Sequence, residues 1–123
     1  MWRYEQSSGK LIDATGFLVA RGYAGRGVGK NNPDMQSVHK VGPLPVGKYT
    51  FGVPVPYSHL GPFAIPLIPD PTNEMFGRGD FYVHGDSIDD PGNASDGCMI
   101  QSHPIRDLMW NSDDHELEVV KGE

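Results

Sequence analysis

Short runs of alternating apolar and polar residues, punctuated by glycine and proline, recur along the whole chain. This pattern predicts strands over residues 2–6, 10–13, 17–23, 48–53, 81–84 and 117–120, and a further short apolar run covers 63–68. Ser102 is placed to cap a short helix that ends at Trp110, with Pro104 in its first turn. We therefore expect a mostly β, α+β fold: a small β-sheet or sandwich with one or two short helices.

Loops rich in glycine and proline separate the predicted elements. They cover residues 25–33 and 54–62, and an acidic loop follows at 87–93. Within the turn at 42–49, Pro43 and Pro45 fix φ and lack an amide proton. We expect this turn at a sheet edge or at the entrance to a strand, and not inside a central strand.

Length and composition indicate a single compact domain over residues 1–123. Hydrophobic residues make up 37% of the chain and charged residues 21%, which is enough apolar surface for one core. No apolar stretch approaches the roughly 18 residues of a membrane-spanning helix, and residues 1–22 do not resemble a signal peptide. We expect a protein made in the cytoplasm that does not insert into a membrane.

Charge and cysteine usage narrow the function classes. The net charge of −6 disfavours nucleic acid and anionic membrane surfaces as partners, whereas an amine-bearing partner suits it better. Cys98 is the single cysteine, so the chain has no internal disulfide, no CxxC redox pair and no multi-cysteine zinc site. Any chemistry at Cys98 therefore uses one thiol.

Cys98 and His84 form a candidate nucleophile and base. His84 ends a predicted strand, and the loop between the two residues is long enough to bring the imidazole to the sulfur. The turn at Asp96 and Gly97 would let the amides of Gly97 and Cys98 point at a developing oxyanion. The alternative is a buried structural cysteine and a structural histidine. An active thiolate predicts fast alkylation near neutral pH.

The flanking residues resemble a known enzyme family. His84-Gly85-Asp86 followed by Ala94-Ser95-Asp96-Gly97-Cys98-Met99-Ile100 resembles the signature of YkuD-type L,D-transpeptidases. The turn Gly42-Pro-Leu-Pro-Val-Gly-Lys-Tyr49 looks like that of a subfamily containing type VI secretion L,D-transpeptidase effectors, which are antibacterial toxins delivered to a rival's periplasm. The resemblance extends through 22–33, 76–78 and 117–120, and so spans nearly the whole chain.

This resemblance implies an L,D-carboxypeptidase or L,D-transpeptidase that acts on peptidoglycan tetrapeptide stems without a cofactor. Cys98 would be the nucleophile, His84 the base, and the Gly85 carbonyl would orient the imidazole. The Gly97 and Cys98 amides would form the oxyanion hole. Arg78, Ser95 and Asp96 are the candidate substrate-binding residues, with Ser95 also able to fix the Cys98 turn. We further expect a monomer with a cognate immunity protein as its partner.

The sequence departs from the family pattern beside the nucleophile. Asp96 stands where the usual motif has histidine, Gln101 stands near a common asparagine, and Ser102 replaces a common arginine. A carboxylate beside the thiol would raise the Cys98 pKa. The competing hypothesis is therefore an inactive peptidoglycan-binding or phage structural module with the same fold.

Metal sites are weaker alternatives. A zinc hydrolase could use His84, Asp86, Cys98 or His103, although no HExxH motif is present. The aspartates at 86, 89, 90 and 96 do not have calcium-loop spacing, which favours a solvated acidic loop. His39, His59 and His115 fall in predicted loops and are expected on the surface.

Overall fold

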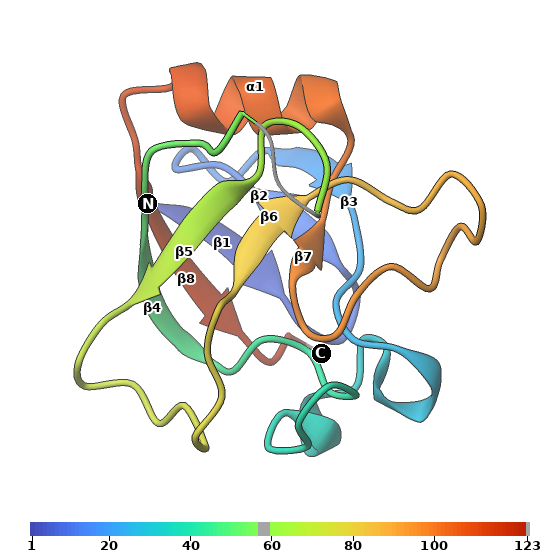
Figure 1. The fold of residues 1–123 in the computed structure, drawn as a ribbon. Coiled ribbons are helices and arrows are strands. Elements are labelled where there is room, and N and C mark those ends of the chain that lie inside the picture. The colour runs from blue at the N-terminus through green and yellow to red at the C-terminus, as the bar shows by residue number, and fades with distance from the viewer. Residues whose placement is uncertain (57–59, 123) are drawn as a thin grey trace.

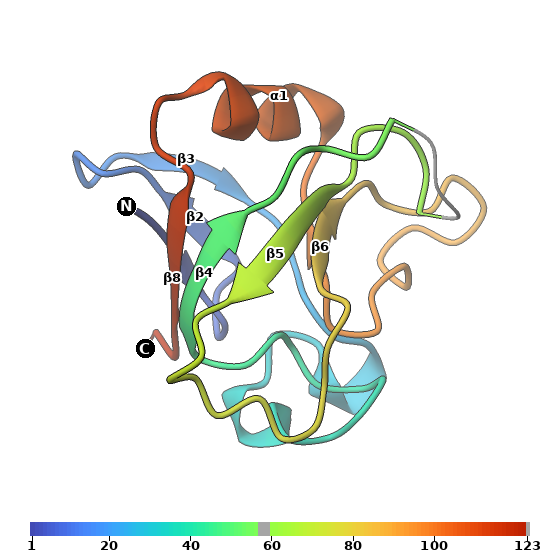
Figure 2. The ribbon, with the colours of Figure 1, turned by 60° about the vertical axis from the view of Figure 1, so that its left-hand side comes forward.

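A strongly curled sheet dominates the structure, a computed structural model that describes residues 1–56 and 60–122. In those residues the sheet has eight strands in the order β3-β2-β1-β8-β4-β5-β6-β7. The strands are β1 (Trp2–Glu5), β2 (Lys10–Ile12), β3 (Leu18–Arg21), β4 (Gly47–Phe51), β5 (Ile65–Pro69), β6 (Tyr82–His84), β7 (Met99–Ile100) and β8 (Glu116–Val120). The helix α1 (His103–Asn111) lies across one end of the sheet, as Figures 1 and 2 show. Two 3-10 turns cover Gly27–Gly29 and Pro33–Met35.

The core follows the period of two that the sequence predicts. Tyr4, Tyr49, Leu117 and Val119 alternate with more exposed neighbours on β1, β4 and β8, and all four are at most 2% exposed. Met109 of α1 packs into the same cluster. The mostly β, α+β prediction is confirmed, and no helix within the described residues is long and apolar enough to cross a membrane.

The sheet curls until its two ends meet. Beyond β3, Tyr23 forms an antiparallel bridge with Ile100 of β7, and its carbonyl accepts a 2.8 Å hydrogen bond from the Ile100 amide. The close approach requires glycine at position 22, because a Cβ atom there would collide with the Ile100 carbonyl oxygen. The glycine therefore lets the amino-terminal hairpin support the strand that follows Cys98.

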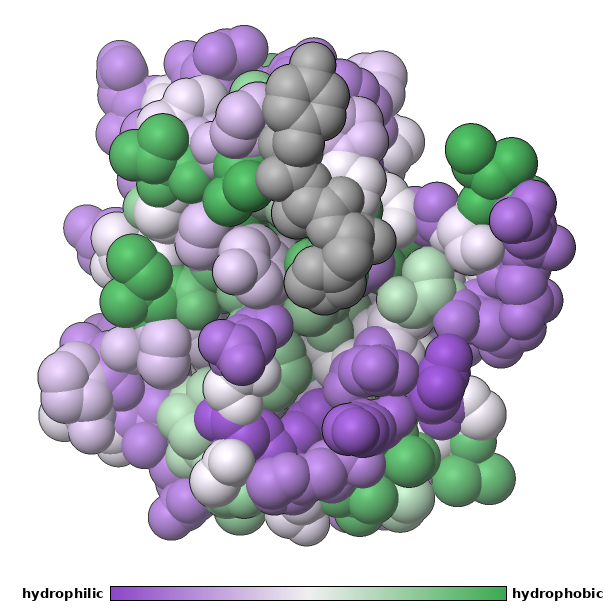
Figure 3. Space-filling view, viewed as in Figure 1, coloured by the Kyte–Doolittle hydropathy of each residue, from purple (hydrophilic) through white to green (hydrophobic). Residues whose placement is uncertain are grey.

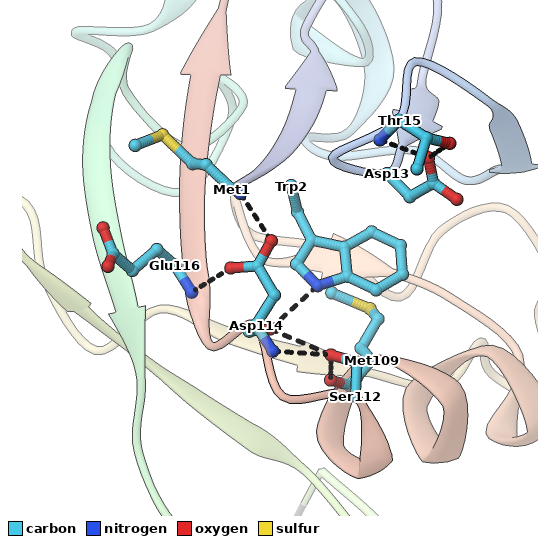
Figure 4. Close-up of polar contacts among 8 residues, drawn as sticks. All are labelled: Met1, Trp2, Asp13, Thr15, Met109, Ser112, Asp114 and Glu116. Carbon is cyan, nitrogen blue, oxygen red and sulfur yellow. Dashed lines mark hydrogen bonds and ion pairs between the residues drawn. The ribbon is translucent and has the colours of Figure 1, made fainter.

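The junction between α1 and β8 is fixed by polar contacts around Asp114, which Figure 4 shows in close-up. The Trp2 indole donates a 2.9 Å hydrogen bond to the Asp114 carbonyl, which also accepts from the Ser112 hydroxyl at 3.0 Å. The Asp114 carboxylate accepts from the Glu116 amide at 3.2 Å. These bonds join the end of α1 to the first and last strands, and so hold the helix over the sheet.

Three elements differ from the sequence predictions. β7 is an additional strand that pairs parallel to β6. β5 carries Pro66 although it lies between β4 and β6, and the Pro66 carbonyl accepts a hydrogen bond from the Gly52 amide. Ser102 occupies the N-cap position of α1, but its side chain forms no capping bond. The predicted loop at 54–62 falls partly outside the described residues.

We predict that Gly22→Ala destabilises the fold by about 2 kcal/mol or more, because the new methyl group must displace the Ile100 backbone. Urea unfolding of both proteins measures the loss. Gly79→Ala is the matched control, since a Cβ atom there meets nothing within 4 Å. Equal stability of the two variants would contradict the proposed closure of the sheet at Gly22.

Candidate active site

A cleft of about 460 Å³ opens beside β6. Its walls come from four segments that are distant in sequence: residues 39–40, Leu60, residues 77–84 and the chain from Ala94 to Cys98. Hydrophilic residues gather on this side of the molecule, over the loops below β6 in the view of Figure 3. The cleft therefore combines a polar rim with the predicted nucleophile and base, because both Cys98 and His84 line it.

The parallel pairing of β6 and β7 brings His84 and Cys98 to one face of the sheet. Val83 pairs with Met99 and His84 with Ile100, and both Val83 and Met99 are fully buried in the core. Since side chains alternate along a strand, His84 and Cys98 share the opposite face. Cys98 directly precedes β7, which places it two residues before the partner of His84.

The His84 ring is held by its neighbour. The side chain is 4% exposed, and Nδ1 lies 2.8 Å from the Gly85 carbonyl oxygen. A carbonyl only accepts, so Nδ1 carries the proton and Nε2 is the basic nitrogen of the neutral ring. Arg106 of α1 supports this corner: it donates to the Gln101 carbonyl at 2.7 Å and to the Phe63 carbonyl at 3.1 Å.

The Cys98 thiol is half-buried at the start of β7. Its sulfur accepts a hydrogen bond from the Tyr82 amide at 3.3 Å and lies 3.8 Å from the Asp80 carbonyl oxygen. Burial raises the pKa of Cys98 to about 11, with further upward contributions from the charges of Asp96 and Asp80. This raised pKa favours the protonated thiol of Cys98 near neutral pH in the unliganded protein.

Ser95 fixes the turn before Cys98. The side chain is fully buried, and its hydroxyl donates to the Cys98 carbonyl at 2.6 Å while accepting from the amides of Gly25 and Gly97. The Gly97 amide, a predicted oxyanion-hole donor, is thus engaged by Ser95 at 3.0 Å. Gly97 has φ of 138°, and a Cβ atom there would collide with Arg78. The geometry gives Ser95 the contacts of a positioning residue and not those of a substrate contact.

Arg78 lines the cleft, but its guanidinium is committed to the protein backbone. Nη1 donates to the carbonyls of Gln36 at 2.6 Å and Pro43 at 2.7 Å, and Nη2 donates to those of Gly42 at 2.9 Å and Asp96 at 3.1 Å. The side chain is 8% exposed. These bonds leave little of the donor fork for the substrate carboxylate that the sequence assigned to it.

The Asp96 side chain points out of the turn. Its carboxylate lies 3.4 Å from Nη1 of Arg26, and about half of each side chain is exposed. Asp86 lies at the start of the acidic loop that precedes Asp96. Its carboxylate accepts hydrogen bonds from the Tyr23 hydroxyl at 2.6 Å and from the Gly92 amide at 3.0 Å. Among the described residues no group of three or more histidine, cysteine or acidic side chains could hold a metal.

Sequence reasoning missed several residues of the cleft wall: His39, Lys40, Asp80 and Tyr82. His39 was expected on the surface; it is exposed, but its Nε2 lies 2.8 Å from the Phe76 carbonyl at the cleft rim. His59 lies outside the described residues, and His115 stacks on Trp110 with ring centroids 4.2 Å apart. Lys40 and Asp80 adopt left-handed backbone conformations, which no sequence pattern indicates.

We predict that alkylation of Cys98 in the folded protein is about a hundredfold slower at pH 8 than in the denatured chain, because burial keeps the thiol protonated. The rate of iodoacetamide modification between pH 6 and pH 11 measures this, and we expect it to keep rising above pH 9. A plateau near pH 8 would contradict the raised pKa. Asp96→Asn should shift the profile toward lower pH, whereas Asp89→Asn, on the far part of the acidic loop, should not.

We also predict that Arg78→Met destabilises the protein by about 3 kcal/mol or more, because it leaves four backbone carbonyls without their donor. Arg26→Met is the control: it removes an exposed ion pair and should cost at most about 1 kcal/mol. Urea unfolding compares the two variants. Similar losses would show that the Arg78 bonds contribute little to the fold.

Comparison with known proteins identifies the family. The family model described as the Tlde1 domain matches residues 19–122, which include every residue of the cleft. Searches of curated proteins and of solved structures gave no match. Tlde1 is a type VI secretion effector family, which implies secretion into target cells and a cognate immunity protein. Because the match covers most of the chain, this protein belongs to the Tlde1 domain family of type VI secretion effectors.

Proposed function

We propose that this effector is a peptidoglycan-targeting cysteine enzyme, an L,D-carboxypeptidase or L,D-transpeptidase that acts on tetrapeptide stems in the periplasm of the target cell. The observation that carries the proposal is that Cys98 shares a cleft with His84, whose ring is oriented by the Gly85 carbonyl. The Gly85 carbonyl holds Nδ1 of His84 at 2.8 Å, and His84 and Cys98 lie on the same face of β6 and β7 in one cleft. Nucleophilic catalysis by cysteine requires such an oriented base.

In the proposed first step the Cys98 sulfur attacks the carbonyl carbon of the bond between the L-centre of diaminopimelate and the following D-residue. Nε2 of His84 takes the thiol proton as the carbon–sulfur bond forms. The same proton passes to the leaving amine as the carbon–nitrogen bond breaks, which leaves a thioester on Cys98. Because the resting thiol is protonated, proton transfer to His84 must accompany the attack.

Release of the thioester decides the reaction type. Water as the second nucleophile gives a tripeptide stem and a free carboxylate, which is the carboxypeptidase reaction. A D-amino acid or a stem amine gives exchange or cross-linking. The effectors that this chain resembles damage the wall by trimming or exchange, and tripeptide stems deprive the cross-linking machinery of donors, so we rank these two reactions above cross-link formation.

The oxyanion donors require one rearrangement in this scheme. The Gly97 amide donates to Ser95 in the resting structure, and it would have to exchange that acceptor for the substrate oxygen. In this scheme Ser95 contributes to catalysis by holding the turn that carries Cys98. The stem's carboxylate would be bound by a residue other than Arg78, whose donors already hold backbone carbonyls.

The second candidate is an inactive peptidoglycan-binding module with the same fold. The raised pKa of Cys98 and the carboxylate of Asp96 beside it favour this reading, since both oppose thiolate formation. Binding without turnover of stems would distinguish it from the enzyme.

Mass spectrometry of purified tetrapeptide and pentapeptide muropeptides, incubated with and without a free D-amino acid, tests the proposal. We expect loss or exchange of the terminal D-alanine with the native protein, and a fall of at least about a thousandfold in rate with Cys98→Ala. His84→Ala should fall similarly, whereas His103→Ala, which changes a half-exposed histidine at the start of α1, should keep its activity.

Full activity of the Cys98→Ala protein would overturn the cysteine mechanism. Unchanged muropeptides in every sample, together with binding to them, would establish the binding module instead. Asp96→His, which restores the usual motif residue, is then the next variant to assay.

A further inference from the structure

One lysine, Lys40, lines the cleft. Lys40 is exposed on the cleft wall and forms no ion pair with any residue in 1–56 or 60–122. The other strong cation of the wall, Arg78, spends its donors on backbone carbonyls. Lys40 is therefore the cation of this wall that remains available to a ligand.

The backbone around Lys40 is fixed on both sides. Before it, the His39 ring bonds to the Phe76 carbonyl at 2.8 Å and lies against Gly77. After it, the Val41 carbonyl accepts from the Arg26 amide at 2.9 Å. Lys40 itself has φ of 64°, a left-handed conformation that these flanking bonds maintain.

The same framework ties Lys40 to the nucleophile. Nη2 of Arg78 donates to the Gly42 carbonyl, two residues after Lys40, and also to the Asp96 carbonyl, two residues before Cys98. One buried guanidinium group thus sets the Lys40 segment and the Cys98 turn relative to each other. Lys40 and Cys98 both line the cleft, so a ligand bound there can contact the ammonium group and the thiol together.

The charges in the cleft explain why such a cation is needed. Asp80 and Asp96 also line the wall, and the protein carries a net charge of −6. Both carboxylates would repel a substrate that ends in a carboxylate. Lys40 on the same cleft wall offsets this repulsion and gives the carboxylate a direct partner.

We propose that Lys40 binds the terminal carboxylate of the stem peptide and so selects stems whose last D-residue is free. This inference rests on the proposed function for the identity of the ligand. It replaces Arg78 as the carboxylate contact, and it restricts the substrate class to uncross-linked stems with a free carboxyl terminus.

Binding to the Cys98→Ala protein tests the assignment without turnover. The probes are a tetrapeptide stem with a free terminal carboxylate and the same stem with a terminal amide, and calorimetry measures both affinities. We expect the acid to bind about tenfold more tightly than the amide, as a charge-assisted contact would produce. The difference should shrink as salt rises, because the contact is solvent-accessible.

Lys40→Gln in the same background should abolish the preference, and Lys40→Arg should largely retain it. Lys48→Gln is the matched control: Lys48 is also exposed, but it lies on β4 and does not line the cleft. Equal affinities for acid and amide, a preference that survives Lys40→Gln, or binding of neither probe would each overturn the role of Lys40.

Turnover by the Cys98-containing protein separates this proposal from the proposed function. If stems are trimmed and the preference for the acid survives Lys40→Gln, the proposed enzymatic function is supported and the role of Lys40 is refuted. If no stem is trimmed but the preference for the acid depends on Lys40, Lys40 binds the carboxylate and the protein is a binding module, not an enzyme.

Discussion

The buried guanidinium of Arg78 is the contact on which the geometry of the cleft depends. Four backbone carbonyls, from Gln36, Gly42, Pro43 and Asp96, converge on it, and its plane also lies near the Phe81 ring at 5.1 Å. Without this contact, the loops that carry these carbonyls would have many arrangements of similar free energy. A single planar group with several donors selects one of them, and it does so from the middle of the cleft wall.

This arrangement gives a physical meaning to two features of the primary structure. Gly97 must be glycine because any side chain would occupy the place of the guanidinium, and the turn that begins at Gly42 supplies two of the carbonyls that Arg78 requires. The proline-rich turn and the Cys98 turn are therefore two halves of one structure. Their separation along the chain conceals this, because the connection runs through backbone atoms.

The sequence predicted most of the strands, and it singled out two residues, His84 and Cys98, that line one cleft, for reasons that lie in local patterns. Alternation marks β1, β4 and β8, and the motif around His84 and Cys98 marks the cleft. It could not predict β7, which has two residues and depends on pairing with β6. It assigned Arg78 to substrate because an arginine in a loop carries no sign that four carbonyls will surround it. Lys40 escaped notice because a left-handed lysine has no sequence pattern.

The aspartate at position 96 is the departure that bears most on chemistry, and its surroundings limit its effect. Its carboxylate points toward Arg26 at 3.4 Å and is more than half exposed, so both a counter-ion and solvent screen its charge from the sulfur. Burial makes the largest contribution to the raised pKa of Cys98, and burial would act equally on a thiol beside the usual histidine. In the proposed mechanism the proton leaves through His84 in either case, and the Gly85 carbonyl orients the ring that would receive it. The charge at position 96 therefore adjusts the acidity of the thiol, while the proposed base, His84, lies on β6 and is unaffected by the replacement.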